Sequence, residues 1–287
     1  MIGMTMQTLF PFGTVVKFSK ANTKLKKLYK VAALSKWLSN KRKIYSFDLL
    51  SGWACPQADK CMSRAIVVDG KRKIQDGENT EFRCFSASQE VVYTNVYNLR
   101  KSNFDAIRAV VSDNSLTDIE KTSKIVDMII AALPKNAGII RIHVAGDFFN
   151  RLYFRAWLIV ATLRSDILFY AYTKALNHWV NYMSDVNDIP NLVLTASHGG
   201  RLDGLIDTYK LRQAIVFQTA EEANDFNFEV DTDDSHAAIP DNRNKSFGLV
   251  IHGTQPPKKK VKNGISKSLM KRLFEADIPF AIYEDFV

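Results

Sequence analysis

The stretch GIIRIHVAG, residues 138–146, opens a repeating pattern that decides the fold of this chain. It is a short apolar run bounded by glycines. Similar runs follow at residues 167–173, 191–197, 213–219, 247–253 and 279–285, and another lies near residues 45–50. Helical or loop-like segments separate these runs. Short apolar strands that alternate with helices are typical of a parallel sheet buried on both faces, so the pattern predicts an α/β fold.

Two architectures fit this alternation. The strands can form a partial or complete (β/α) barrel or an open doubly wound sheet, and we favour the barrel-like parallel sheet. Residues 115–133 carry an apolar stripe at helical spacing, with Ser115 as the expected N-cap and Asp118 at the capping-box distance. We expect residues 1–44 to form a helical, basic N-terminal extension and residues 45–287 to form a single α/β domain with cysteine-bearing loops and a metal site.

The composition indicates a globular protein of the cytoplasm. The chain has 287 residues, of which 46% are hydrophobic, so it can bury one large core. No apolar run reaches about 18 residues, and the N-terminus lacks the charged start and the cleavage site of a signal peptide. Three cysteines are too few, and odd in number, for a disulfide framework. We therefore expect free thiols in a reducing compartment and no association with membranes.

The net charge of +9 is unevenly distributed along the chain. Between Lys17 and Lys43 there are ten Lys or Arg residues and no acidic residue. Such a segment suits contact with the phosphates of a nucleic acid. The alternative is a solvated helix face, because Leu25, Leu28 and other apolar residues lie roughly on one side of a helix here.

The carboxyl ends of the predicted strands carry polar side chains. Ligands bind at this edge of parallel sheets, so these residues are candidates for an active site. They are His143, Asp147, Tyr172, Thr173, Lys174, Ser197, His198, Gln218, Thr219, His252, Thr254, Glu284 and Asp285. We expect Lys174, His143 or His198 to move protons and Asp147 to orient them, although each histidine can equally be a hydrogen-bonded structural residue.

Two glycines follow Ser197 and His198. Gly199 and Gly200 allow the backbone amides to approach an anionic or phosphate-bearing ligand. We therefore group Ser197, Gly199 and Gly200 as candidate cofactor-binding residues. The acidic, turn-rich segment that begins at Glu221 lacks the spacing of a calcium loop and is expected to form a mobile loop over the site.

The three cysteines follow the pattern C-x5-C-x22-C, as Cys55, Cys61 and Cys84. Gly52, Trp53 and Pro56 place the first two in a loop, which lets both thiols face the same ligand. Three thiolates without a fourth are the ligands of a [4Fe-4S] cluster that keeps one iron open to a small molecule. The alternatives are zinc, with His143 or His198 as a further ligand, a catalytic cysteine, or three cysteines that are merely small buried hydrophobic side chains.

Five motifs resemble a family of phage and mobile-element proteins named after gene product 88 of a mycobacteriophage. They are LSGWACPQADKCMSRAI (50–66), FRCFSASQEVVY (82–93), HVAGDFFNRLYFRAW (143–157), FYAYTKAL (169–176) and PNLVLTASHGG (190–200). The resemblance covers roughly residues 45–205. It implies a phage-encoded protein of the host cytoplasm and no established reaction.

A more distant similarity concerns the order GDFF, YTK, PNLVLTAS. It is similar to a phage group related to radical S-adenosylmethionine enzymes, which implies a partial (β/α) barrel with a three-cysteine cluster and S-adenosylmethionine as a cofactor. The chain departs from the C-x3-C-x2-C pattern of those enzymes, because 22 residues separate Cys61 from Cys84.

The sequence therefore supports two hypotheses of function. The first is an enzyme that acts on a small-molecule substrate through redox, radical or Lewis-acid chemistry at the open iron of a cluster. The second is a nucleic-acid-binding protein, stabilised by zinc or without metal, that uses the segment from Lys17 to Lys43. The sequence predicts neither the substrate nor the oligomeric state.

Overall fold

The strands of the main sheet lie side by side in the order in which they occur in the sequence. The structure is a computed structural model that describes residues 16–253 and 255. Its seven-stranded sheet has the order β1-β2-β5-β6-β7-β8-β9. The strands are β1 (Ser19–Lys20), β2 (Lys43–Phe47), β5 (Ala137–Ile142), β6 (Leu168–Thr173), β7 (Leu192–Ser197), β8 (Gln213–Phe217) and β9 (Phe247–Val250).

All neighbouring strands are parallel except β1, which pairs antiparallel with β2. A doubly wound sheet would reverse its strand order at a switch point, whereas here each strand lies next to its predecessor, as in a (β/α) barrel. In the described part of the chain no pairing joins β1 to β9, so the sheet stays open. The α/β prediction is confirmed, with a barrel-like strand order but no closed barrel.

Each predicted strand between residues 45 and 253 corresponds to a strand of this sheet. The last predicted strand, residues 279–285, lies outside the described residues, and so do Thr254, Glu284 and Asp285. The strands alternate their side chains between two cores. In β5, for example, Ile140 and Ile142 face the larger core, and Ile139 faces the smaller one.

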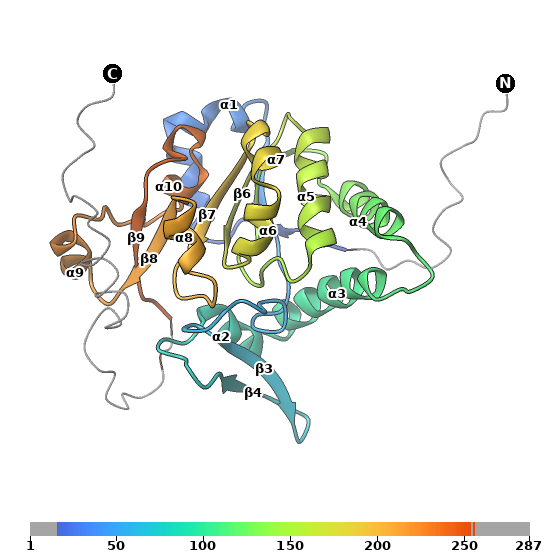
Figure 1. Ribbon diagram of the computed structural model, residues 1–287, viewed down its shortest axis with the longest axis horizontal. Helices are drawn as coiled ribbons and strands as arrows, with labels where there is room; N and C mark the ends of the chain where they lie inside the picture. Colours follow the sequence, from blue (N-terminus) through green and yellow to red (C-terminus); the bar gives the residue numbers. More distant parts are fainter. Residues whose placement is uncertain (1–15, 254, 256–287) are drawn as a thin grey trace.

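Helices cover the larger core (Figure 1). They are α3 (Thr94–Val111), α4 (Asp118–Ala132), α5 (Arg151–Leu163), α6 (Leu176–Asn181), α7 (Met183–Asp188) and α8 (Gly204–Thr208). Helix α4 has its N-cap at Thr117, whose hydroxyl accepts from the amide of Glu120 while the Glu120 carboxylate accepts from the amide of Thr117. The prediction of Ser115 as the N-cap was wrong, because its hydroxyl donates to Asp113 in the preceding turn.

Basic N-terminal residues cover the smaller core on the opposite face of the sheet. They form two 3-10 helices, Leu25–Lys30 and Ala32–Leu34, and the short helix α1 (Ser35–Leu38). Leu25, Leu28 and Leu34 are fully buried against the sheet. Helix α10 (Ser235–Ala238) also packs on this face. In the chain it lies between α9 (Ala220–Asp225) and a 3-10 helix, Pro240–Asn242.

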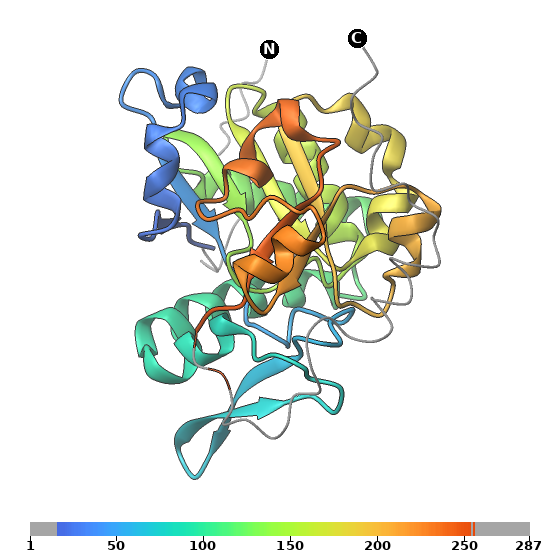
Figure 2. The same cartoon turned by 90° about the vertical axis from the view of Figure 1, so that its left-hand side faces the viewer.

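A β-hairpin and a helix occupy the stretch between β2 and α3 (Figures 1 and 2). We call residues 50–92 the cysteine segment. It contains β3 (Ser63–Val68), β4 (Lys71–Asp76) and α2 (Phe85–Val92), and β3 and β4 form a separate antiparallel sheet. The hairpin turns at Asp69 and Gly70, whose positive φ angles of 52° and 72° are typical of a tight hairpin turn. Neither strand lies within the apolar runs from which the sheet is predicted, so both are absent from the sequence-based prediction.

Candidate functional site

A cavity of about 480 Å³ lies at the carboxyl ends of the parallel strands. We call the main sheet, with the helices and loops that connect its strands, the framework. The framework contributes Val144, Tyr172, Lys174, Ser197 and Val216, together with the residues that follow β9. The cysteine segment contributes Cys61, Phe82, Arg83, Cys84, Phe85 and Gln89, and the N-terminal residues Asn22, Thr23 and Lys24 complete the wall. This is the edge of the sheet at which ligands bind in parallel α/β proteins.

The hairpin explains how cysteines that are distant in the sequence come together. Cys61 lies two residues before β3 and Cys84 lies directly before α2, so the chain leaves Cys61 along one strand and returns toward Cys84 along the other. Cys61 and Cys84 both line the cavity. All three cysteines are free and partly buried. The 22 residues between Cys61 and Cys84 therefore form a hairpin, which brings the two thiols together in space.

The three thiols interact electrostatically. Burial raises the pKa of Cys55 well above its ordinary value, and the charges of Asp147, Cys84 and Cys61 raise it further. Burial and the charge of Cys61 also raise the pKa of Cys84, while the backbone amides of Ala87 and Ser86 at the start of α2 oppose this effect. Mutual repulsion of this kind operates only between groups that lie close together.

The loop of Cys55 and Cys61 is held against the loop that follows β7. Ala58 forms an antiparallel bridge with Gly200, and the amide of Lys60 donates to the carbonyl of Gly199 over 2.9 Å. A Cβ atom at Gly200 would lie 3.0 Å from the carbonyl oxygen of Gln57, so a larger residue there would require the neighbouring backbone to shift by a few tenths of an ångström. The glycine pair thus allows the cysteine loop to dock.

The amides of these two glycines are engaged within the chain. Both donate to the carboxylate of Asp203 over 2.9 Å, and the same carboxylate lies 3.2 Å from Nδ1 of His198. Asp203 therefore orients the glycine loop and the imidazole together. A role of Gly199 and Gly200 in binding a cofactor stays a prediction, and the contacts in this structure are those of loop docking.

A buried ion pair fixes the other end of the cysteine loop. Oε1 of Glu90 accepts from the amide and the hydroxyl of Ser51, each over 2.9 Å, and from Nη1 of Arg100 over 3.1 Å. Glu90 is fully buried, and its burial raises the pKa of the carboxyl although Arg100 lowers it. Ser51 precedes Cys55 by four residues, so this pair sets where the loop begins.

Lys174 directly follows β6 and lies close to two of the cysteines. Its Nζ donates to Oγ of Ser197 over 2.6 Å. Burial lowers the pKa of Lys174, but the charges of Cys61, Asp147, Asp203 and Cys55 outweigh burial and raise it above its ordinary value. The side chain is therefore a cation beside two of the thiols.

Asp147 holds the backbone at the end of β6. Its Oδ1 accepts from the hydroxyl of Thr173 and the amide of Phe148, each over 2.7 Å, and its Oδ2 accepts from the amide of Lys174 over 2.8 Å. Burial raises the pKa of the carboxyl, and these hydrogen bonds oppose the increase. The predicted orienting residue thus fixes Lys174 through its backbone.

A second charged cluster, which includes Lys24, Arg141 and Asp234, also lines the cavity. Asp234 is fully buried; it pairs with Arg141, and its Oδ1 lies 2.7 Å from Nζ of Lys24. Its Oδ2 also accepts from the hydroxyl of Tyr170 over 3.1 Å. Although burial raises the pKa of Asp234, the two cations lower it below its ordinary value. The acidic segment expected to be a mobile loop supplies this buried residue of the wall.

The histidines of the strand ends lie in different environments. His143 is buried between Phe148 and Tyr153, with Nε2 2.8 Å from the Tyr153 hydroxyl, and it does not line the cavity. Burial and the charge of Arg141 lower its pKa to about 3, so the imidazole is neutral. His252 lines the cavity and lies against Phe85, with ring centroids 4.7 Å apart.

The remaining predicted strand-end residues have structural contacts. The hydroxyl of Thr219 accepts from the amide of Glu222 and caps α9, and the amide of Gln218 donates to the Glu222 carboxylate. Among the described residues, no group of three His, Cys, Asp or Glu side chains is arranged to hold a single metal ion.

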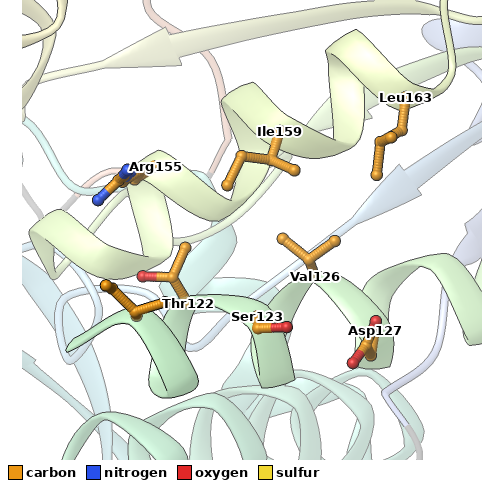
Figure 3. A pocket seen from close by; sticks show the side chains of 8 residues that line it. Thr122, Ser123, Val126, Asp127, Arg155, Ile159 and Leu163 are labelled. Carbon is orange, nitrogen blue, oxygen red and sulfur yellow. The ribbon is translucent and has the colours of Figure 1, made fainter. Parts of the chain in front are cut away.

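A second hollow, of about 330 Å³, lies between α4 and α5 (Figure 3). Its lining is mixed, with Val126, Ile159 and Leu163 beside Asp127 and Arg155. It contains neither a cysteine nor a histidine. We therefore assign the candidate site to the cavity beside the cysteines.

Several residues of the site carried no clear signal in the sequence. Glu90, Arg100 and Asp234 form ion pairs with residues of other elements, and Asp203 holds the loop that follows β7. Arg141 lies within a predicted strand, whereas the candidate residues are those at the strand ends. The capping and strand-end rules identify positions along one element, whereas the ion pairs of Glu90, Arg100 and Asp234 join different elements.

Comparison with known proteins gives one family. The model of a family described as Gene product 88 matches residues 16–268. No curated protein and no solved structure matches the chain. The comparisons therefore do not show a similarity to radical S-adenosylmethionine enzymes. No helix among the described residues is long and apolar enough to span a membrane.

Proposed function

This chain belongs to the gene product 88 family, and from the site that its residues build we propose that it is an iron–sulfur enzyme. In this proposal Cys55, Cys61 and Cys84 hold a [4Fe-4S] cluster, and the adjoining cavity binds a small-molecule substrate. The observation that carries it is that Cys61 and Cys84 line one cavity at the carboxyl ends of the strands, while Cys55 lies close enough to both to interact with them electrostatically.

The donor set fits such a cluster better than it fits one zinc ion. Ligands of a single ion all lie at about 2.0 to 2.3 Å from it, which brings them close to one another. A cluster distributes its thiolates over separate irons, so its ligands lie further apart. The three thiols interact electrostatically, yet no three donors in the described residues are arranged around one ion. His143 is buried among aromatic rings and His198 faces Asp203.

Charged groups around the thiols also suit an anionic centre. Lys174 lies beside Cys61 and Cys55, and the amides of Ser86 and Ala87 point to Cys84. Positive charge and amide donors stabilise thiolate ligands and tune the centre that they hold. When bound, a cluster with three cysteine ligands supplies an open iron for redox or Lewis-acid chemistry.

The chain's own residues define the rest of the mechanism. Lys174 is protonated at neutral pH, so its Nζ can donate a hydrogen bond or a proton to a bound substrate, with Ser197 orienting it. Asp147 fixes the backbone of Lys174. His143 is neutral and outside the cavity, so we assign proton transfer to Lys174 and a packing role against Phe148 and Tyr153 to His143.

The cavity lining favours an anionic substrate. Lys24, Arg83, Arg141 and Lys174 line it, against the single carboxylate of Asp234. Apolar side chains such as Phe85 and Leu249 exclude water from the same space. Carboxylates and phosphates are the groups that arginine and lysine recognise. Inorganic pyrophosphate is the anionic probe for this cavity, and we propose to test it beside S-adenosylmethionine, which carries a carboxylate but has a net positive charge from its sulfonium and ammonium groups.

The decisive experiment is metal analysis of protein purified without oxygen. We expect about four irons and four sulfides per chain and a brown colour. Single Cys55→Ser, Cys61→Ser and Cys84→Ser variants should each lose them while keeping the same circular dichroism spectrum. Lys174→Met should keep the iron and bind pyrophosphate more weakly, by about ten-fold.

The matched control for the thiols is Ser88→Ala, which changes a side chain of α2 near Cys84 without removing a thiol. It should keep the iron. Protein that contains no iron and no sulfide, or that contains one zinc ion lost in the cysteine variants, would contradict the cluster.

A second proposal concerns the basic N-terminal residues and nucleic acid. Their leucines are buried on the sheet, while Lys26 and Lys30 are exposed, as are most lysines between residues 17 and 43. This arrangement leaves a lysine-rich surface, and residues 17–43, which form it, contain no acidic residue. Its contact with nucleic acid is tested by the Lys26→Gln/Lys30→Gln variant in the binding experiment described next.

A further inference from the structure

The two faces of the β3–β4 hairpin differ in what they contact. Cross-strand partners lie on the same face, so Ser63, Ala65 and Val67 share one face with Asp76, Ile74 and Arg72. This inner face packs toward α2 and α3 except at Val67, which is 59% exposed: Ala65 is buried, and Arg72 donates to the carbonyl of Val91 and lies over the ring of Tyr97.

The outer face carries cations and aliphatic side chains in alternation. Its cross-strand pairs are Arg64 with Gln75, Ile66 with Lys73, and Val68 with Lys71. Lys71, Lys73 and Gln75 are exposed, and Arg64 lies over the ring of Trp53 at 4.4 Å from its centroid. Trp53 itself is 44% exposed, so an aromatic ring stands at the base of this face.

No carboxylate neutralises the outer face. Among the ion pairs of the described residues, none involves Arg64, Lys71 or Lys73. The two acidic residues of the hairpin lie elsewhere: Asp69 is in the turn, and Asp76 is on the inner face, where it pairs with Arg83. The face therefore presents three cations to a negatively charged partner.

We propose that the outer face of the β3–β4 hairpin binds double-stranded nucleic acid, with the hairpin lying in a groove. Each strand has six residues, which corresponds to a ribbon roughly 20 Å long. The hairpin extends away from the rest of the molecule in both views (Figures 1 and 2). The major groove of DNA, about 12 Å wide, admits a two-stranded ribbon.

The chemistry of the outer face matches that use. Lysine and arginine side chains contact the phosphates and set the position of the ribbon, while aliphatic side chains such as Ile66 and Val68 can touch base edges. The inference does not depend on the metal, because the hairpin residues that carry it are not thiols. It does place a nucleic acid on the cysteine segment itself, because the hairpin is part of that segment.

The test is binding of the full chain to a fluorescein-labelled duplex of about 20 base pairs, followed by anisotropy at several salt concentrations. We expect Lys71→Gln/Lys73→Gln to weaken binding by about ten-fold at fixed salt. The slope of log affinity against log salt should become less steep by about 2, because two phosphate contacts are lost. Both side chains are exposed, so the fold should be unchanged.

The matched control is Lys124→Gln/Lys135→Gln, which removes two exposed lysines at α4 and the turn after it. It should bind as the unaltered chain does. The proposal is overturned if the hairpin variant binds equally well, if both double variants lose the same affinity, or if only Lys26→Gln/Lys30→Gln loses it. It is also overturned if the unaltered chain binds no duplex, or binds vesicles containing phosphatidylserine in place of it.

Discussion

The strand framework and the cysteine segment meet at one cavity but are stabilised by different contacts. The framework is held by large buried side chains such as Trp157, Tyr153 and Phe169, all at most 1% exposed. In the cysteine segment the buried apolar residues are one leucine, Leu50, and four alanines, Ala54, Ala58, Ala65 and Ala87. Hydrogen bonds, the Glu90–Arg100 pair and close backbone contacts hold this segment in place.

This difference indicates a division of labour. Close packing of large side chains fixes the strand ends, and these define where a ligand can bind. A segment held by polar contacts can place three thiols and a hairpin around that point without a core of its own. We therefore expect changes in the framework to alter stability most, and changes in the cysteine segment to alter metal content as well.

The largest effect on stability is expected for Trp157→Ala in the framework. The indole lies against Phe47 and Phe169, with ring centroids 5.3 and 6.1 Å away, so its removal leaves a large cavity. We expect the free energy of unfolding to fall by about 3 to 5 kcal/mol in urea denaturation. Iron bound per folded chain should not change.

The control for this variant is Leu163→Ala in the same helix. Leu163 is 62% exposed, so the loss should stay below about 1 kcal/mol. If the two variants were equally destabilised, or if Trp157→Ala lost iron from the folded protein, the separation of framework and cysteine segment would be wrong.

A smaller loss of stability, with a loss of metal, is expected for Glu90→Gln in the cysteine segment. The amide keeps one acceptor for Ser51 but leaves Arg100 buried without its carboxylate partner. Removing one member of a buried pair costs about 3 kcal/mol. Because Ser51 begins the loop of Cys55, iron content should fall too, as measured by metal analysis of the purified variant.

Glu81→Gln is the matched control for Glu90→Gln. Glu81 pairs with Lys60 in the same segment at 2.8 Å, but both side chains are about one-third exposed. A pair of this kind contributes less than about 1 kcal/mol. Full iron content in Glu90→Gln would show that the buried pair does not set the position of the loop.

The same division explains what the sequence could predict. The strands near residues 138 to 253 are regular apolar runs, and a parallel sheet follows from their period and spacing alone. The strand-end rule led to Lys174 and Ser197, which do line the cavity. The hairpin was missed because neither of its faces is uniformly apolar or polar: the outer face pairs Ile66 with Lys73, and the inner face pairs Val67 with Arg72. Glu90 and Asp234 were missed because their partners, Arg100 and Arg141, come from other elements.

The smallest expected effect is a pH dependence of stability that arises in α10, the short helix that directly follows the cavity-lining residue Asp234. His236 lies in α10, with Nδ1 3.7 Å from Oδ1 of Asp231 and Nε2 3.2 Å from Oε2 of Glu229. Asp231 and then Glu229 raise the pKa of the imidazole to about 8, while burial opposes them. The folded pKa thus exceeds the ordinary value of about 6.5.

The sign of this dependence follows from proton linkage. The charged imidazole stabilises the folded chain fully below pH of about 6.5, and this contribution is lost as the pH rises through about 8. Since Glu229 is 80% exposed and screened by solvent, we expect a loss of about 1 kcal/mol. Urea denaturation between pH 6 and 9, in steps of about half a unit, should show it. In His236→Gln this part of the pH dependence should be absent, and an equal decline in the variant would assign the effect to other groups.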